Sequence, residues 1–342
     1  MADRRSALGR AQERIVGIPA RLRDRGQARL LRRFDGAVVL LYHRVAHLDP
    51  DPFSMAVPPE HFADHLRVIR ARCEPLSLAE LVAALRRRRL PRRGVVVTFD
   101  DGYADNLHAA EPLLTAHQVP ATVFVATGYV ETRREFWWDE LERLVKRAAD
   151  SAVELRLEVG GRRFAYERLT QVAATTALAD LQFALRRATA DEIAASVEAL
   201  RASVGAPAGM PVRDTHRPLE PDELRLLARD ELIEIGAHTR WHACLARASS
   251  AEQQDELAGS KRHLEDWLDQ RVNSVSFPFG RRTRDYTRRT VRIARQVGFE
   301  RAAVRFPARV TALTSPLQIP RVVAPALPGG EFERWLEDRF AR

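Results

Sequence analysis

Short apolar runs alternate with helix-forming segments along most of this chain, and this alternation limits the folds that it can adopt. Runs that predict strands cover residues 37–42, 94–99, 121–125, 232–237, 275–277, 302–304 and 317–321, and helices are expected at 59–72, 77–89, 104–117, 221–229, 251–269, 286–297 and 331–340. Strands separated by helices pair in parallel through right-handed crossovers. About seven such units in 342 residues predict an α/β fold, a distorted (β/α) barrel whose functional groups gather at the carboxyl ends of its strands.

The alternation is interrupted between residues 131 and 215. A helix is expected at 137–148, a hairpin at 153–166 that turns at Gly160-Gly161, and two further helices at 171–188 and 191–203. We interpret this stretch as a mainly helical insertion that covers one side of the barrel. The predicted organisation is a basic N-terminal segment (1–34), a first part of the barrel (35–130), the insertion (131–215), a second part of the barrel (216–328) and a C-terminal helix (329–342).

The net charge of +9 raises the question of a nucleic-acid partner. Only Lys146 and Lys261 are lysines, so the positive charge is a general arginine bias, and the basic residues are spread along the chain without interleaved aromatics. We therefore expect no nucleic-acid partner. Cys73 and Cys244 are the only cysteines, which argues against a disulfide framework.

Ten arginines lie between residues 4 and 33, with apolar residues among them. A basic amphipathic segment of this kind can lie on an anionic membrane surface. Gly17, Pro19 and Gly26 interrupt any helix, however, which favours a solvated lead-in. No apolar run has the roughly 18 residues of a membrane span, and the N-terminus lacks a signal-like apolar core. A cytoplasmic protein is expected, with peripheral contact to the inner membrane surface as the alternative.

Two polar clusters follow predicted strands. Asp100-Asp101 ends the strand at 94–99, and His238 and His242 follow the strand at 232–237. In a helical turn, a spacing of four residues would place both imidazoles on one face, as a metal site requires. One carboxylate and two histidines would leave open positions on a divalent cation, with a second carboxylate beside it. The alternatives are a helix N-cap for the aspartates and an accidental histidine pair.

Together these residues resemble the polysaccharide deacetylase family, the NodB-type carbohydrate esterases. Thr98-Phe99-Asp100-Asp101-Gly102 matches the first motif of that family, His238-Thr239 with His242 matches the second, and Ser276-Phe277-Pro278-Phe279-Gly280 is similar to the third. The resemblance covers about residues 36–325, apart from the insertion. The segments at 41–45 and 319–322 further resemble a branch linked to exopolysaccharide biosynthesis.

The resemblance implies a distorted (β/α) barrel and metal-dependent removal of acetyl groups from an N-acetylated sugar. Asp101, His238 and His242 would be the metal ligands, with zinc expected and cobalt, nickel or iron as alternatives. Asp100 would be the general base that activates water. By the same analogy, the backbone N–H of Phe279 would help to stabilise the oxyanion.

Two departures from the family pattern leave roles to be filled. The third motif usually begins with an arginine that orients the base, and here that position is Ser276. Arg321 is the candidate replacement, because a guanidinium can hold a carboxylate at two points; the alternative is a surface arginine. The late histidine that supplies the general acid is absent, since no histidine follows His263. His43, at the end of the first strand, is the candidate acid.

Trp137 and Trp138 fall where the insertion leaves the barrel. They would either stack on sugar rings in a glycan groove or belong to the core of the insertion. The expected function is a metal-dependent deacetylase of an N-acetylated sugar in a polysaccharide or a lipid-linked precursor. The alternatives are a deacylase of a non-sugar amide or an O-acetyl ester, and a non-catalytic glycan-binding relative.

Overall fold

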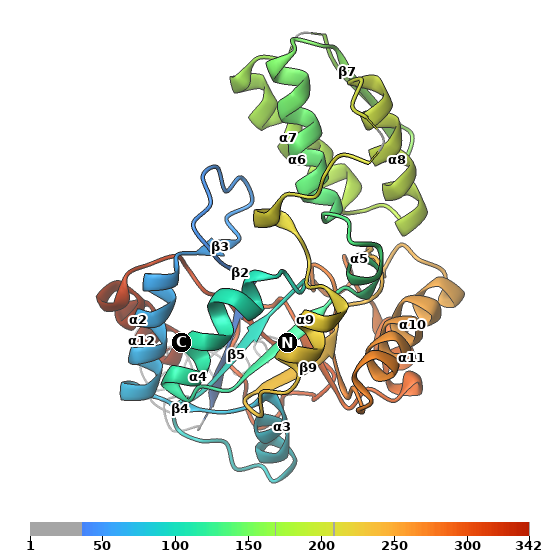
Figure 1. Ribbon diagram of the computed structural model, residues 1–342. Helices are drawn as coiled ribbons and strands as arrows, with labels where there is room; N and C mark the ends of the chain where they lie inside the picture. Colours follow the sequence, from blue (N-terminus) through green and yellow to red (C-terminus); the bar gives the residue numbers. More distant parts are fainter. Residues whose placement is uncertain (1–35, 168, 208, 342) are drawn as a thin grey trace, which may run out of the picture.

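Parallel strands in chain order form the main sheet of the protein, whose computed structural model describes residues 36–167, 169–207 and 209–341 (Figure 1). The basic segment at 4–33 lies outside the described residues. Six strands run along the sheet in the order of the chain: β1 (Ala37–Tyr42), β5 (Gly94–Phe99), β6 (Ala121–Val125), β9 (Ile233–Ala237), β10 (Ser274–Ser276) and β11 (Arg301–Val304). A short strand, β4 (Glu74–Pro75), pairs with the start of β5 outside this path.

One segment near the C-terminus closes the sheet into a barrel. β12 (Ile319–Pro320) pairs with β11, and β13 (Val322–Val323) pairs with β1. Only Arg321 separates these two strands, so a single stretch of chain joins both ends of the sheet. The closed path contains seven successive segments, which confirms the predicted distorted (β/α) barrel. The last of them was expected at 317–321 and lies two residues later.

The barrel strands are buried on both faces. Every residue of β1 and of β5 is buried, and the two strands pair in register from Ala37 opposite Gly94 to Tyr42 opposite Phe99. A parallel strand with the barrel interior on one side and helices on the other has no polar face. This is why the apolar runs of the sequence located these strands.

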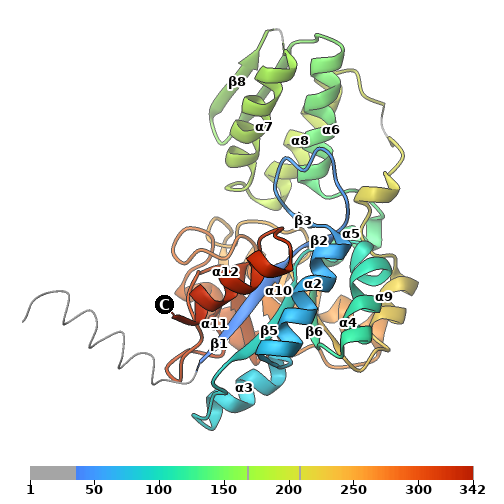
Figure 2. The ribbon, with the colours of Figure 1, turned by 90° about the vertical axis from the view of Figure 1, so that its left-hand side faces the viewer.

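Helices surround the barrel, as Figure 2 shows from the side. They are α2 (Pro59–Arg72), α3 (Leu78–Arg86), α4 (Glu111–His117), α5 (Thr127–Thr132), α9 (Pro221–Leu227), α10 (Ser250–Leu268), α11 (Arg288–Val297) and α12 (Gly329–Ala341). The helix expected at 77–89 begins with the capping box of Ser77 and Glu80 but ends at Arg86, because Arg88 has a positive φ of 54°. The helix expected at 104–117 begins instead with a π-helical turn, η1 (Asn106–Ala110).

The C-terminal helix α12 packs against α2 on the outside of the barrel (Figure 2). Phe332 is fully buried, and its ring stacks on His65 of α2 with 3.7 Å between the ring centroids. Burial of a large apolar side chain contributes about 1.5–3 kcal/mol. This contact therefore ties the end of the chain to the first crossover helix.

The interruption after β6 forms a separate layer above the carboxyl ends of the barrel strands (Figure 1). It contains α6 (Trp137–Asp150), the hairpin of β7 (Leu155–Val159) and β8 (Arg162–Tyr166), α7 (Gln171–Leu185) and α8 (Ala190–Ser203). These elements share a hydrophobic cluster that includes Trp138, Leu181 and Leu200. Tyr103 and Tyr129 of the barrel belong to the same cluster, so the insertion packs directly on the barrel.

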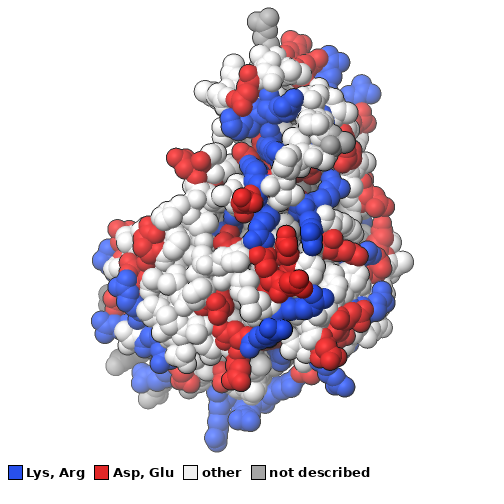
Figure 3. All heavy atoms as spheres, in the orientation of Figure 1, with Lys and Arg blue, Asp and Glu red and all other residues white. Residues whose placement is uncertain are grey.

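Acidic and basic side chains are interspersed over the face of the molecule drawn in Figure 3, and the net charge does not gather into one basic stripe on that face. Among the helices that the structure describes, none combines the length and the apolar character needed to cross a membrane.

Candidate active site

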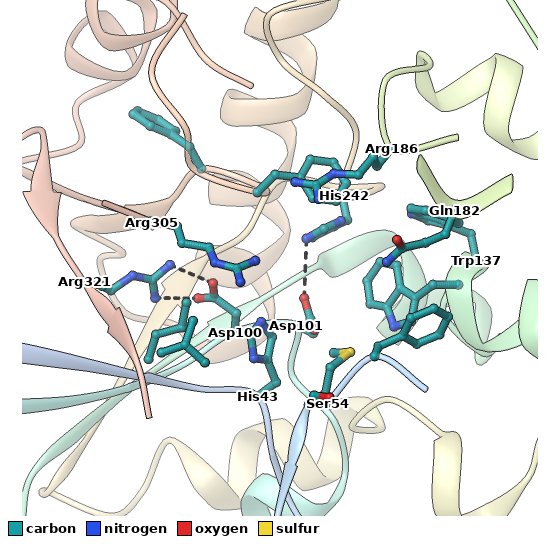
Figure 4. Close-up of a pocket in the computed structure, with 17 residues that line it drawn as sticks. His43, Ser54, Asp100, Asp101, Trp137, Gln182, Arg186, His242, Arg305 and Arg321 are labelled. Carbon is teal, nitrogen blue, oxygen red and sulfur yellow. Dashed lines mark hydrogen bonds and ion pairs between the residues drawn. The ribbon is translucent and has the colours of Figure 1, made fainter. Parts of the chain in front are cut away.

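The chemically active side chains meet at the carboxyl ends of the barrel strands, in a pocket beneath the insertion (Figure 4). Asp100 and Asp101 follow β5, and His238 follows β9. Arg321 lies between β12 and β13. These groups are separated by up to 221 positions in the chain, and the closed sheet brings them together.

A tight turn aims both aspartates at the pocket. Asp100 directly follows β5 and continues its pairing with β1, since its N–H donates to Tyr42 O at 3.0 Å. Asp101 has a positive φ of 77°, and Gly102 follows with a φ of 86°. A side chain on Gly102 would place its Cβ only 3.1 Å from Val125, so the turn requires glycine there. Because the chain leaves the strand at Asp101, the second carboxylate lines the same pocket as the first.

Arg321 holds the Asp100 carboxylate at two points. Its Nη1 and Nη2 each donate to one carboxylate oxygen at 2.7 Å, and Nη2 also donates to Ser276 Oγ at 2.6 Å. Burial alone would raise the pKa of Asp100, but the charge and the hydrogen bonds of Arg321 outweigh it and hold the pKa well below its usual value. Asp100 is therefore an ionised carboxylate in a site from which water is largely excluded.

Asp101, His238 and His242 offer one ligand atom each, and these atoms lie within 4.8 Å of one another. All three side chains are buried. His238 Nδ1 lies 2.8 Å from Ser276 O, and because a carbonyl only accepts, Nδ1 carries the proton. The lone pair is then on Nε2, which lies 3.6 Å from Asp101 Oδ1. His242 Nε2 lies at the same distance from that oxygen.

This donor set fits a divalent cation. Asp101 Oδ1 is buried, and among the described residues no hydrogen-bond donor reaches it. Burial and the charge of Asp100 raise the pKa of Asp101 well above its usual value, and the charges of Arg321 and Arg44 do not offset them. Burial lowers the pKa of both His238 and His242, which keeps their ring lone pairs free to bind a metal. One carboxylate and two neutral imidazoles are borderline-to-hard ligands of the kind that zinc accepts.

The expected helical turn between the two histidines is wrong. Residues 238–242 form a loop in which Thr239 and His242 both have positive φ angles, of 64° and 53°. The Thr239 hydroxyl accepts a hydrogen bond from His242 N–H at 3.1 Å, which closes the loop. The two imidazole rings lie edge to face, with 4.8 Å between their centroids and 65° between their planes. The loop therefore brings both rings to one place, as a helical turn would have done.

His43, Trp137, Trp138 and Phe279 all line the pocket. Trp137 and Trp138 are also buried within the cluster of the insertion, so they are core residues and pocket wall at the same time. The rings of Trp138 and Phe279 each lie 4.7 Å from the His242 ring and hold it from two sides. Burial lowers the pKa of His43 to about 4, so its imidazole is neutral near pH 7.

Several further pocket residues were not found from the sequence, and Gln182, Arg186 and Arg305 are among them. Arg305 directly follows β11, and its position after a predicted strand was a signal that could have identified it. Gln182 and Arg186 come from α7 and its C-terminal end. No pattern in the sequence indicates that this helix of the insertion faces the barrel.

A sequence profile described as "Polysaccharide deacetylase" matches residues 87–207 and 203–302, which together are more than half of the chain.

Individual relatives agree with this match. YxkH of Bacillus subtilis (strain 168), whose name describes a polysaccharide deacetylase, is 20% identical over 302 residues, which are 87% of this chain and 75% of that protein. The Streptococcus pyogenes deacetylase PplD, solved in complex with acetate, is 18% identical with a TM-score of 0.58 and covers 90% of this chain and 99% of its own. IcaB from Ammonifex degensii is 17% identical with a TM-score of 0.54, and the match covers 90% of this chain and 97% of IcaB. At these identities, the solved structures show a common fold.

Proposed function

This chain belongs to the polysaccharide deacetylase family, and we propose that it is a metal-dependent hydrolase that removes N-acetyl groups from a sugar. The sugar would be part of a polysaccharide or of a lipid-linked glycan precursor. The observation that carries this proposal is the buried group of Asp101, His238 and His242 beside the ionised Asp100. A carboxylate held in its charged form next to a metal-binding group can act as the general base of a metal-dependent hydrolase.

Asp101 Oδ1 and the Nε2 atoms of His238 and His242 are the proposed ligands. Zinc is the expected cation, with cobalt, nickel or iron as alternatives. When bound at such a site, a divalent cation polarises a carbonyl oxygen and lowers the pKa of water. Ser276 contributes through its backbone, because its carbonyl fixes the tautomer and the orientation of His238.

Asp100 is the proposed general base. Arg321 keeps it ionised and fixes both of its oxygens, so the carboxylate is ready to accept a proton from the attacking water. Arg321 thus takes the place of the arginine that the third motif usually supplies. It acts through Asp100 and is a positioning residue.

Phe279 N–H is the proposed donor to the oxygen of the acetyl carbonyl. Phe279 has a positive φ of 59°, and none of the described residues accepts a hydrogen bond from its N–H. A free backbone donor in a buried pocket can stabilise negative charge that develops on an oxygen.

His43 is the proposed proton donor to the leaving nitrogen. Because its pKa is lowered to about 4, the imidazole is neutral at rest near pH 7. The proton that Asp100 takes from water must therefore reach His43 within the cycle before His43 can give it to the amine. Trp137 and Trp138 form the wall on the insertion side, where a sugar ring can pack against aromatic surface.

Elemental analysis of the purified protein tests the ligand set. We expect about one transition metal per chain in the wild type, and loss of that metal in His238→Ala and Asp101→Ala. His47→Ala is the matched control, because the His47 side chain is 69% exposed. Metal content equal to the wild type in both ligand variants would contradict the proposed site.

Release of acetate from N-acetylglucosamine oligomers tests the chemistry. Asp100→Asn should keep its metal and lose about 10²–10⁴-fold in turnover, as removal of a general base does. Retained turnover in Asp100→Asn would show that the base is misassigned. Acetate release from O-acetylated sugars alone would change the proposed substrate to an ester.

Residues 4–33 carry a second part of the proposal, which is peripheral contact with the inner membrane surface from the cytoplasmic side. Their ten arginines would favour anionic lipid headgroups. Co-sedimentation of the full chain with vesicles that contain anionic lipid, and its loss when residues 1–34 are deleted, is the expected result. Full-length protein that stays in the supernatant would contradict this part.

A further inference from the structure

Three arginines line the pocket, and two of them have no acidic partner at hydrogen-bond distance among the described residues. Arg321 is committed to Asp100. Arg186 and Arg305 line the same pocket. Arg186 reaches it from the insertion, and Arg305 reaches it from the end of β11, next to Arg321 (Figure 4). The mechanism described above uses neither of them.

Arg186 is held in place without a hydrogen bond to any described carboxylate. Its side chain is 16% exposed, and its guanidinium lies 4.4 Å over the ring of Phe279. Its Nε and Nη2 are buried, and no described residue accepts a hydrogen bond from them. The nearest carboxylate oxygen, Asp285 Oδ2, is 3.9 Å away and already accepts from Arg281 N–H at 2.9 Å. Arg186 therefore has unused hydrogen-bond donors next to Phe279, whose ring packs on the proposed metal ligand His242.

Arg305 reaches the pocket from a rigid point of the backbone. Its N–H donates to Gly280 O at 3.1 Å, which ties the end of β11 to the loop after β10. In Figure 4 its side chain lies beside the Asp100–Arg321 pair and faces the space in front of His242. No described carboxylate forms a salt bridge with it.

The two guanidinium groups also repel each other. Burial is the largest cause that lowers the pKa of both Arg186 and Arg305, and neighbouring arginines that include Arg281 lower it further, against the opposing charge of Asp285. A guanidinium nevertheless stays protonated near pH 7. Like charges gathered in a partly desolvated pocket are unfavourable unless an anion joins them. Asp101 does not balance them, because its charge would be taken up by the cation that it binds.

We propose that this pocket binds an oxyanion carried by the substrate, a phosphate ester or a sugar carboxylate, and that Arg186 and Arg305 are the residues that select it. The inference rests on the proposed function, because it names the class of sugar on which the same site acts. A guanidinium matches the planar or tetrahedral oxygens of both groups with two parallel hydrogen bonds. The pocket holds about 120 Å³, which suits an acetamido group with an adjacent anionic substituent and leaves the remainder of a glycan outside.

Binding measured by calorimetry tests the proposal without depending on turnover. Three probes share the acetamido sugar: the anomeric phosphate of N-acetylglucosamine, a disaccharide of N-acetylglucosamine and glucuronate, and the neutral disaccharide of N-acetylglucosamine. We expect one of the anionic probes to bind at least about tenfold more tightly than the neutral one, as hydrogen bonds to a charged group would provide. The probe with the higher affinity identifies the anion as phosphate or carboxylate.

Variants assign that preference to the two arginines. Arg186→Gln and Arg305→Gln should each weaken binding of the anionic probe by about tenfold or more and leave binding of the neutral probe unchanged. Arg186→Lys should recover part of the loss, because it keeps the charge. The matched control is Arg187→Gln: Arg187 is the exposed neighbour of Arg186 and lines a different hollow, so it changes the net charge equally without touching the pocket.

Two results would overturn the inference. One is equal affinity for the anionic and neutral probes. The other is a preference for anions that survives in Arg186→Gln and Arg305→Gln but disappears in Asp101→Ala, because the anion would then bind the cation alone. Failure of the proposed function gives a different result: arginine-dependent binding would remain, but the wild type would release no acetate from any of the three probes.

Discussion

Replacing Arg321 with methionine removes the group that keeps Asp100 charged inside the barrel. Arg321 is 1% exposed and provides both of the 2.7 Å hydrogen bonds to the carboxylate. After the change, the remaining side-chain donor to Asp100 among the described residues is Ser276 Oγ at 3.3 Å. Breaking a buried pair from one side costs about 3–5 kcal/mol, because it leaves an uncompensated charge.

The pKa of Asp100 should rise in this variant. Two influences compete in the wild type: burial raises the pKa, and Arg321 is the largest of the charges that lower it. Without Arg321, burial dominates. A general base must be ionised to act, so the acid limb of the rate against pH should move to higher pH in Arg321→Met. Arg321→Lys keeps a charge but can make only one of the two hydrogen bonds to Asp100. The acid limb of this variant should therefore lie between those of the wild type and Arg321→Met.

The stability of the two proteins should also depend differently on pH. In the wild type the folded pKa of Asp100 is depressed, so its stabilisation is present above the unfolded pKa of about 3.9 and is lost only as the pH falls through the lower folded value. In Arg321→Met the folded pKa is raised, and stability is lost as the pH rises above the unfolded value. The difference in unfolding free energy between the wild type and Arg321→Met should therefore become smaller as the pH is lowered.

Two measurements check this reasoning: acetate release from pH 4 to 9, with metal content measured at each pH, and urea unfolding over the same range. Constant metal content excludes loss of the cation as the cause of a shifted limb. An acid limb at the same pH in wild type and Arg321→Met, with unfolding free energies within about 1 kcal/mol, would refute the account of the pair.

Two further predictions concern the scaffold. Gly280→Ala should destabilise the fold by about 2 kcal/mol or more, because Gly280 has a φ of 69° and an added Cβ would lie 2.3 Å from Arg305 N. Gly161→Ala, with a φ of 75° and nothing within 4 Å of the added Cβ, should cost only the backbone strain of about 1 kcal/mol. Urea unfolding of both variants separates the cost of the contact from the cost of the strain. His65 forms a hydrogen bond with Leu327 O at 2.7 Å, and burial lowers its pKa from 6.5 to about 4. Between these two values the unfolded chain binds one more proton than the folded chain, so the free energy of unfolding falls as the pH falls. His65→Gln should reduce this dependence by up to about 1.4 kcal/mol per pH unit, and an unchanged dependence would show that His65 is protonated in the folded state.

The sequence located most of the barrel because its strands are buried on both sides. β1 and β5 were expected from continuous apolar runs and occur at those positions. The closing segment was harder to place. Pro320 has no N–H to donate and Arg321 is charged, so the local pattern is weak, and only the requirement to pair with both β11 and β1 sets its register.

The candidate site shows a similar division between residue identity and geometry. The residues of the two polar clusters could be chosen from the sequence because their spacing and their places after strands are local features. The conformation of the histidine loop could not, since a four-residue spacing fits a helical turn equally well. The positive φ angles of Thr239 and His242 arise from how the loop after β9 packs.

The residues that reach the pocket from the insertion could not be predicted from the sequence, for a different reason. Arg186 is one of 55 basic residues, so an arginine carries little information by itself in this chain. Its importance follows from the way in which the insertion packs on the barrel, through Tyr103, whose hydroxyl donates to Asp139 at 2.7 Å and accepts from Trp138 at 2.7 Å. That contact is tertiary and leaves no periodic signal.

Because Arg321 lies in the segment that closes the barrel, the charge state of the proposed base, Asp100, depends on that closure. The two strands that flank it complete the sheet, and its side chain points inward to Asp100 from the seam that they form. Until residues 319–323 pair on both sides, Asp100 lacks the guanidinium of Arg321, which is the largest of the charges that lower its pKa, and burial would favour its neutral form. An open barrel would therefore hold a protonated acid where the closed one holds a base. Substitutions that weaken the seam, even far from the pocket, should raise the apparent pKa of the base before they unfold the protein.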